Sequence, residues 1–127
     1  MVSQLETQAA ISAVEPVAGS EPSAMKLIGI EEHFLTAEVR DAWQTLGLAA
    51  VDPSVAFHAG VIEGRLLDLA EQRLALMDET GLDVQVLSLT TPSLHDLGAE
   101  SVDIARRVND TLAEAVALVA AGGSPAC

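Results

Sequence analysis

The segment Met25-Lys-Leu-Ile-Gly-Ile-Glu-Glu-His-Phe34 has the composition of an apolar β-strand that ends in two carboxylates and an imidazole. Because side chains alternate along a strand, Glu31 and His33 are predicted to project to one side and Glu32 to the other. A carboxylate oxygen and an imidazole nitrogen suit zinc, manganese or iron, but a catalytic zinc normally takes three ligands from its protein. The segment therefore predicts part of a metal site whose other ligands come from elsewhere. The alternative is a strand whose polar end simply reaches solvent.

Helical and strand patterns alternate along the rest of the chain. Thr36 is a suitable N-cap for the next helix, and Gly47 and Gly81 stand where two helices are predicted to stop. An apolar stripe at helical spacing predicts that the longer middle helix buries one face. The predicted elements after the first strand are a helix over residues 36–46, a loop over 49–60, a helix over 62–80, a strand over 84–89 and a helix over 99–119.

This order of strand, helices, strand and helix is typical of an α/β fold with a parallel sheet and crossover helices. A doubly wound nucleotide-binding fold is one way to complete it, but the sequence contains no Gly-x-Gly-x-x-Gly. Carboxylates and an imidazole follow the first strand where a phosphate cradle needs glycines. A (β/α)8 barrel fits better, because its functional groups lie at the carboxyl ends of strands, where Glu31, His33 and Thr90 are predicted to stand.

Composition excludes several kinds of partner. Nineteen Asp and Glu against six Lys and Arg give a formal net charge of −13, which repels nucleic acid and anionic membrane surfaces. The only cysteine, Cys127, has no partner for an internal disulfide, and the first residues lack the pattern of a signal peptide. We therefore expect a cytoplasmic protein that binds neither nucleic acid nor membranes.

Three segments resemble the N-terminal part of the amidohydrolase superfamily, specifically amidohydrolase family 2. The similarity is to the branch of aminocarboxymuconate-semialdehyde decarboxylase and the resorcylate and dihydroxybenzoate decarboxylases. The segments are Ile30-Glu-Glu-His-Phe34, Arg73-Leu-Ala-Leu-Met-Asp-Glu-Thr-Gly-Leu-Asp-Val-Gln-Val-Leu-Ser-Leu-Thr-Thr-Pro92 and Ala105-Arg-Arg-Val-Asn-Asp-Thr-Leu-Ala-Glu-Ala-Val116. The middle segment is the most specific, because a helix, its glycine stop and a strand recur together there.

The resemblance implies an enzyme, a metal-dependent carboxy-lyase or hydrolase that acts on a small aromatic or muconate-type carboxylic acid. It implies that Glu31 and His33 bind a divalent metal, zinc or manganese, which acts as Lewis acid and template. It also makes Thr90, Thr91 and His95 candidates for substrate contact. The alternatives are turn residues bonded to local backbone for the two threonines and a solvated loop histidine for His95. No catalytic residue is assigned, because the acid or base of such enzymes comes from later strands.

The resemblance also divides the chain. Residues 1–24 are predicted to be a disordered leader, with Met25 as an alternative start, and residues 25–119 are predicted to be the N-terminal portion of a barrel truncated after its second βα unit. Residues 120–127 form a divergent tail. Because the match stops near Ala117, we expect a frameshift or premature end there, which the nucleotide sequence would test.

Three functions remain open on these grounds. The first is a fragment of a metal-dependent decarboxylase or hydrolase. The second is a non-catalytic interaction module that needs a partner chain or associates with itself through exposed sheet edges. The third is an unrelated small α/β binding domain, in which the Glu-Glu-His segment only exposes polar side chains to solvent.

Overall fold

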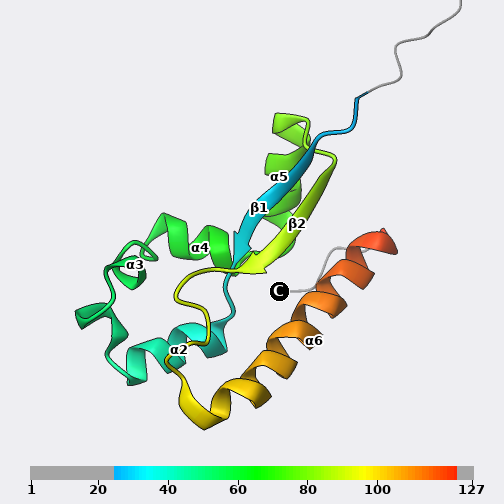
Figure 1. Ribbon diagram of the computed structural model, residues 1–127. Helices are drawn as coiled ribbons and strands as arrows, with labels where there is room; N and C mark the ends of the chain where they lie inside the picture. The colour runs from blue at the N-terminus through cyan, green and yellow to red at the C-terminus, as the bar shows by residue number, and fades with distance from the viewer. Residues whose placement is uncertain (1–24, 123–127) are drawn as a thin grey trace, which may run out of the picture.

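The computed structural model describes residues 25–122, so the predicted leader and most of the predicted tail lie outside the described residues. The elements in chain order are β1 (Ile28–Phe34), α2 (Ala37–Thr45), η1 (Leu48–Ala50), α3 (Pro53–Ala56), α4 (Val61–Leu67), α5 (Glu71–Thr80), β2 (Val84–Leu89), η2 (Gly98–Glu100) and α6 (Ser101–Ala120) (Figure 1). Both strands and the final long helix lie where the sequence predicts them.

The two strands β1 and β2 form a parallel sheet, with all the helices from α2 to α5 between them in the chain (Figure 1). Phe34 pairs with Leu89 and Gly29 with Gln85, but the offset between partners changes between Gly29 and Glu32. Three residue steps in β1 oppose two steps in β2 there, which is a β-bulge. The predicted α/β class with parallel strands is confirmed.

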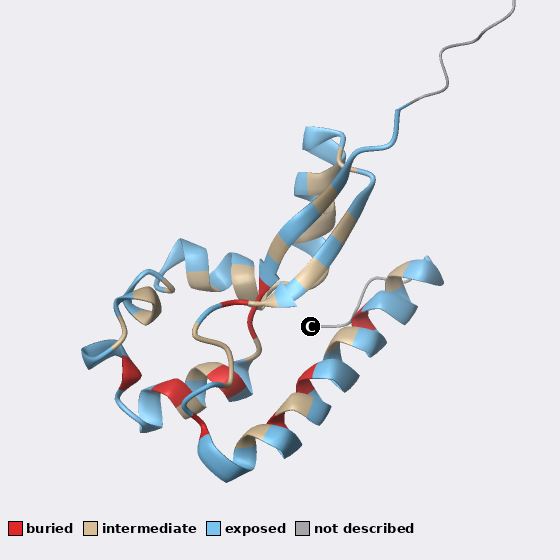
Figure 2. Ribbon diagram, viewed as in Figure 1, coloured by how far each residue is buried: buried red, intermediate tan, exposed pale blue. Residues whose placement is uncertain are grey.

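The hydrophobic core lies beyond the carboxyl ends of the strands rather than across the sheet (Figure 2). Its buried residues come from the end of β1, from α2 and η1, from the loop after β2 and from the first half of α6. They are Phe34, Leu35, Val39, Trp43, Leu48, Leu97, Ile104 and Val108. The sheet itself remains open: Ile30 in β1 is 72% exposed and Val86 in β2 is 52% exposed.

Helix α2 begins and ends as predicted. The Thr36 hydroxyl accepts a hydrogen bond from the Val39 amide, 3.4 Å away, and so caps the N-terminus. Gly47 follows the helix with φ of 63°, a left-handed conformation that glycine adopts without steric cost. Val39 and Trp43 are buried on one face, so this short helix supplies much of the core.

The prediction of one helix over residues 62–80 is wrong, because the structure contains two helices, α4 and α5, with a break at residues 68–70. The Asp68 carboxylate accepts hydrogen bonds from the amides of Ala70, at 2.9 Å, and Arg73, at 3.4 Å. Asp68 itself is extended, with φ of −83° and ψ of 112°. A short acidic side chain that bonds nearby amides competes with the helical pattern and starts a new helix. The apolar stripe is half-buried rather than fully buried, at Leu67, Ala70, Leu74 and Met77.

The segment predicted as a loop over residues 49–60 is also more ordered than expected, because η1 and α3 lie within or beside it. Asp52 caps α3 by accepting from the Ser54 amide at 2.8 Å, and Pro53 occupies the first turn. This local capping signal is too short to give a helical period, so periodicity alone misses it.

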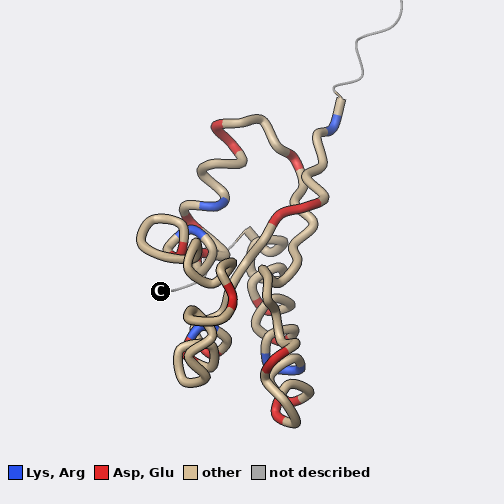
Figure 3. Tube along the Cα trace, turned by 60° about the vertical axis from the view of Figure 1, so that its left-hand side comes forward, with Lys and Arg blue, Asp and Glu red and all other residues tan. Residues whose placement is uncertain are grey.

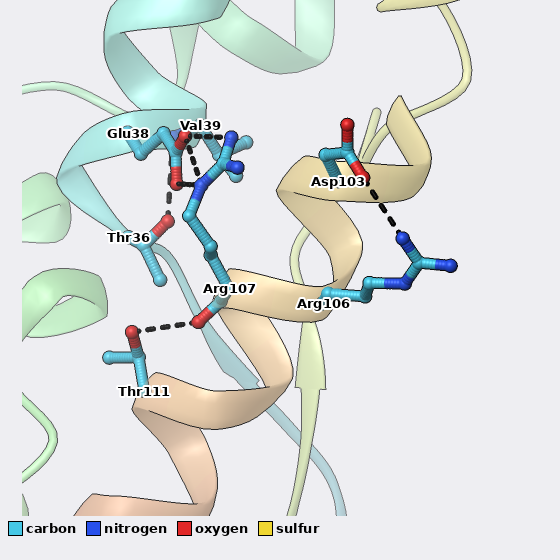
Figure 4. Close-up of polar contacts among 7 residues, drawn as sticks. All are labelled: Thr36, Glu38, Val39, Asp103, Arg106, Arg107 and Thr111. Carbon is cyan, nitrogen blue, oxygen red and sulfur yellow. Dashed lines mark hydrogen bonds and ion pairs between the residues drawn. The ribbon is translucent and has the colours of Figure 1, made fainter. Parts of the chain in front are cut away.

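An ion pair joins α6 to α2 (Figure 4). Arg107 donates to Glu38 through Nη2, 2.6 Å from Oε1, and through Nε, 2.9 Å from the same oxygen. These hydrogen bonds lower the pKa of Glu38. The neighbouring Arg106 instead pairs with Asp103 on its own helix at 3.0 Å. Arg107 therefore makes an interhelical contact, whereas the Arg106 pair is local.

Acidic residues are distributed along most of the described chain (Figure 3). None of the helices between residues 25 and 122 combines the length and apolar character needed to cross a bilayer.

Candidate functional site

The predicted ligand pair lies in the second half of β1. Glu31 and His33 are exposed, whereas Glu32 between them is half-buried. The Glu32 side chain folds over Gly29, where an added Cβ would lie 2.6 Å from Glu32 Oε1. That Glu31 and His33 share one side of the strand stays a prediction from the alternation of side chains. All three residues, Glu31, Glu32 and His33, line a cavity of about 370 Å³ that α4, α5 and β2 also border.

Two contacts hold His33 in place. Its Nδ1 atom lies 3.0 Å from the Ser88 hydroxyl on β2, and His33 and Ser88 are register partners in the sheet. Its carbonyl oxygen accepts a hydrogen bond from Arg73 Nη2 at 2.8 Å, so helix α5 fixes the strand backbone at this residue. Strand β2 thus contacts the imidazole of His33, and helix α5 contacts the backbone of the same residue.

A second imidazole stands at the end of the strands. His58 Nε2 lies 3.2 Å from the Thr90 hydroxyl, and the ring stacks on Trp43 with centroids 5.7 Å apart. His58 Nδ1 is buried and has no hydrogen-bond partner among the described residues. Burial lowers the pKa of His58; nearby Asp52 opposes this shift and the charge of His33 adds to it. The charge of His33 therefore contributes to the lowered pKa of His58.

The sequence around His58 does not indicate a functional role, because no residue at a suitable spacing is predicted to contact its imidazole. Its contacts with Thr90, 32 positions later, and with Trp43 exist only because the segment after α3 packs against α2 and the end of β2. No local pattern would have identified it.

The three substrate-contact candidates lie in different surroundings. Thr90 is only 4% exposed, and its hydroxyl contacts His58. Thr91 is exposed, and so is His95, whose Nδ1 donates to the Pro92 carbonyl at 2.9 Å. None of the three borders the cavity of Glu31 and His33. Their role in substrate contact stays a prediction.

The described residues contain no complete metal site. Between residues 25 and 122, no group of three or more His, Cys, Asp and Glu side chains is arranged to hold a metal ion. Glu31 and His33 are chemically suited to a divalent ion, one through oxygen and one through nitrogen. The structure therefore provides at most two of the three or more protein ligands that a catalytic site normally uses.

Lowering the pH below about 6.5, the usual pKa of histidine, should reduce the free energy of unfolding. The pKa of folded His58 is depressed, so the unfolded chain takes up a proton that the folded chain does not. The stability is complete above the unfolded pKa and decreases as the pH falls toward the folded pKa. Urea unfolding at about pH 7.5 and about pH 5.5 measures this loss.

The variant His58→Gln should show a smaller loss between the same two pH values. His95→Gln is the matched control, because that ring is exposed. An equal pH dependence in the natural chain and in His58→Gln would contradict the assignment of this loss to His58.

Comparison with known proteins relates this chain to a set of enzymes. No protein-family model matches the sequence. The chain is 36% identical over 93 residues to gamma-resorcylate decarboxylase from Rhodococcus jostii. The aligned region covers 68% of this chain and 25% of the relative. It is also 36% identical over 92 residues to gamma-resorcylate decarboxylase from Polaromonas sp., covering 71% of this chain and 26% of the relative. The chain thus spans about a quarter of the length of the curated relatives it matches.

A solved structure gives the same result. The structure of 5-carboxyvanillate decarboxylase from Novosphingobium aromaticivorans, complexed with manganese and 4-hydroxy-3-methoxy-5-nitrobenzoic acid, matches with a TM-score of 0.59 and 38% identity. The match covers 72% of this chain and 30% of that structure's chain. The resemblance drawn from the three sequence segments is confirmed: over the part that it shares with them, this chain is a homologue of amidohydrolase-family decarboxylases.

Proposed function

We propose that residues 25–119 are the first two βα units of a barrel enzyme that decarboxylates a small aromatic carboxylic acid with the help of a divalent metal. The observation that most supports this proposal is that Glu31 and His33 are both exposed late in β1 and border the same cavity. They do so in a chain that is similar to decarboxylases. Decarboxylation is preferred over hydrolysis because the relatives described above are decarboxylases.

Manganese is the preferred ion. The solved relative contains manganese, and a carboxylate with an imidazole suits that ion as well as zinc. A bound divalent ion acts as a Lewis acid and as a template for the oxygens of an aromatic acid. Glu31 would contribute an oxygen ligand and His33 a nitrogen ligand, while Arg73 keeps the strand backbone at His33 in position.

Chemistry beyond binding needs groups that the described residues do not provide. A decarboxylation requires a proton donor for the carbon that loses carbon dioxide, and a catalytic metal normally needs more than two protein ligands. We therefore expect the chain of 127 residues to bind manganese weakly and to show little or no turnover of γ-resorcylate or 5-carboxyvanillate. Thr90, Thr91 and His95 remain the proposed substrate contacts.

The double variant Glu31→Ala with His33→Ala should lose manganese binding, because both proposed ligands are removed. The signal of free Mn²⁺ in electron paramagnetic resonance measures the bound fraction directly. The matched control is Glu32→Gln with His95→Gln, which removes a neighbouring carboxylate and another imidazole. Binding by the double alanine variant equal to that of the natural chain would refute the ligand assignment.

A second candidate function is an interaction module, and the open sheet favours it. Ile28 is 55% exposed and Ile30 72% exposed, and the sheet of two strands leaves both outer edges unpaired within residues 25–122. Parallel sheets are normally covered on both faces, so such a surface favours association with another chain or with a second copy. Sedimentation of the samples used for manganese binding separates the candidates: a compact monomer that binds manganese stoichiometrically would exclude the interaction module.

Location in the cytoplasm stays a prediction.

A further inference from the structure

Ser88 stands directly opposite His33 in the sheet. Their pairing is fixed on both sides, because Glu32 pairs with Leu87 and Phe34 with Leu89. The Ser88 hydroxyl oxygen lies 3.0 Å from His33 Nδ1. This distance is that of a hydrogen bond between a ring nitrogen and a hydroxyl. The bond is therefore built into the register of the two strands.

The contact leaves one ring nitrogen of His33 for other use. Within residues 25–122, His33 Nε2 makes no hydrogen bond, whereas Nδ1 is engaged by Ser88. Histidines that bind metals generally donate their other N–H to an acceptor, which fixes both the tautomer and the direction of the ring. A serine hydroxyl can be that acceptor. The contact between His33 Nδ1 and the Ser88 hydroxyl has the geometry that such a donor and acceptor require.

We propose that Ser88 is a positioning residue that holds the His33 ring with Nδ1 protonated and Nε2 free to bind a divalent cation. The inference rests on the proposed role of His33 as a ligand and adds which nitrogen binds and what orients it. Ser88 does not touch the ion in this arrangement. It acts through His33, while Arg73 holds the backbone of the same residue.

Two variants of Ser88 separate its proposed hydrogen bond to His33 from a role in the packing of the sheet. Ser88 is exposed, and a β-branched residue at an exposed strand position is accepted at least as well as serine. Ser88→Val should therefore preserve the sheet while removing the hydrogen-bond acceptor. Ser88→Thr preserves both the sheet and the hydroxyl. The two variants differ by one hydroxyl in place of a methyl group, so they isolate the hydrogen bond from packing.

The tautomer of His33 tests the inference without metal. In the chain labelled with ¹⁵N at histidine, long-range ¹H–¹⁵N correlation spectra at a pH where the ring is neutral report which nitrogen carries the proton. We expect the Nδ1-protonated form at His33 in the natural chain and in Ser88→Thr, and a shift toward the Nε2-protonated form in Ser88→Val. An Nε2-protonated His33 in the natural chain would overturn the inference.

Manganese binding gives the second readout. Loss of such an outer partner typically weakens metal binding about 10-fold or more, so Ser88→Val should show a loss of this order and Ser88→Thr little change. Circular dichroism checks that each variant is folded. Weakened binding in His33→Ala with unchanged binding in Ser88→Val would overturn the role of Ser88 and leave the proposed function standing. Unchanged binding in His33→Ala would overturn the proposed function itself, and the tautomer would still decide whether Ser88 orients the ring.

Discussion

Replacing Trp43 with alanine is expected to lower the free energy of unfolding by about 3–5 kcal/mol, the usual cost of deleting a large buried aromatic side chain. Trp43 is only 1% exposed and is among the largest fully buried side chains. Its Nε1–H donates to the Ser93 carbonyl at 2.9 Å, and its ring stacks on His58. The substitution removes the packing of α2 and the support of the loop after β2 together.

Urea unfolding followed by far-ultraviolet circular dichroism measures this effect, because the fluorescence of the only tryptophan is lost in the variant. The loss is comparable to the whole stability of a small domain, so a large fraction of the variant is expected to be unfolded without denaturant. Phe57→Ala is the control, since Phe57 is 72% exposed and should change stability by at most about 0.5 kcal/mol. Similar losses in the two variants would contradict the placement of the core around Trp43.

Replacing Arg73 with methionine is expected to have the second largest effect on stability, about 1.5–3 kcal/mol, because several hydrogen-bond acceptors lose a charged donor. Arg73 donates to the backbone carbonyls of Asp68, at 2.9 Å, and His33, at 2.8 Å. It also donates to the Gln85 side chain at 3.1 Å. Burial lowers the pKa of Arg73, although a guanidinium stays protonated at any ordinary pH.

Arg73→Lys should recover only a minor part of the lost stability, because one ammonium group cannot reproduce the planar fork that serves several acceptors. Urea unfolding measures both variants, and hydrogen exchange at the β1 amides reports whether the strand is loosened. Arg106→Met is the matched control, because Arg106 makes an exposed pair with Asp103 and should change stability little. If Arg73→Met resembled Arg106→Met, the contacts of Arg73 would not be stabilising.

Local signals account for the parts of the fold that were predicted correctly. The strand over residues 84–89 has the predicted limits, and the helix capped by Thr36 ends before Gly47 as expected. Alternating apolar residues with two valines, a capping hydroxyl and a glycine in a left-handed conformation all act within a few residues. The break at Asp68 was missed because the apolar period continues across it, while the acidic side chain redirects the backbone.

The candidate site likewise combines features that the sequence predicts with contacts that only the tertiary structure creates. The residue order along β1 is enough to predict that Glu31 and His33 lie on one side of a strand, because alternation is a property of the extended backbone. Only the tertiary structure brings Ser88 to His33 and Thr90 to His58, since those contacts join residues 55 and 32 positions apart. They depend on the strand register and on the packing of the segment after α3 against α2 and the end of β2. The free energy of these arrangements comes from surfaces buried between distant segments, which no local sequence pattern encodes.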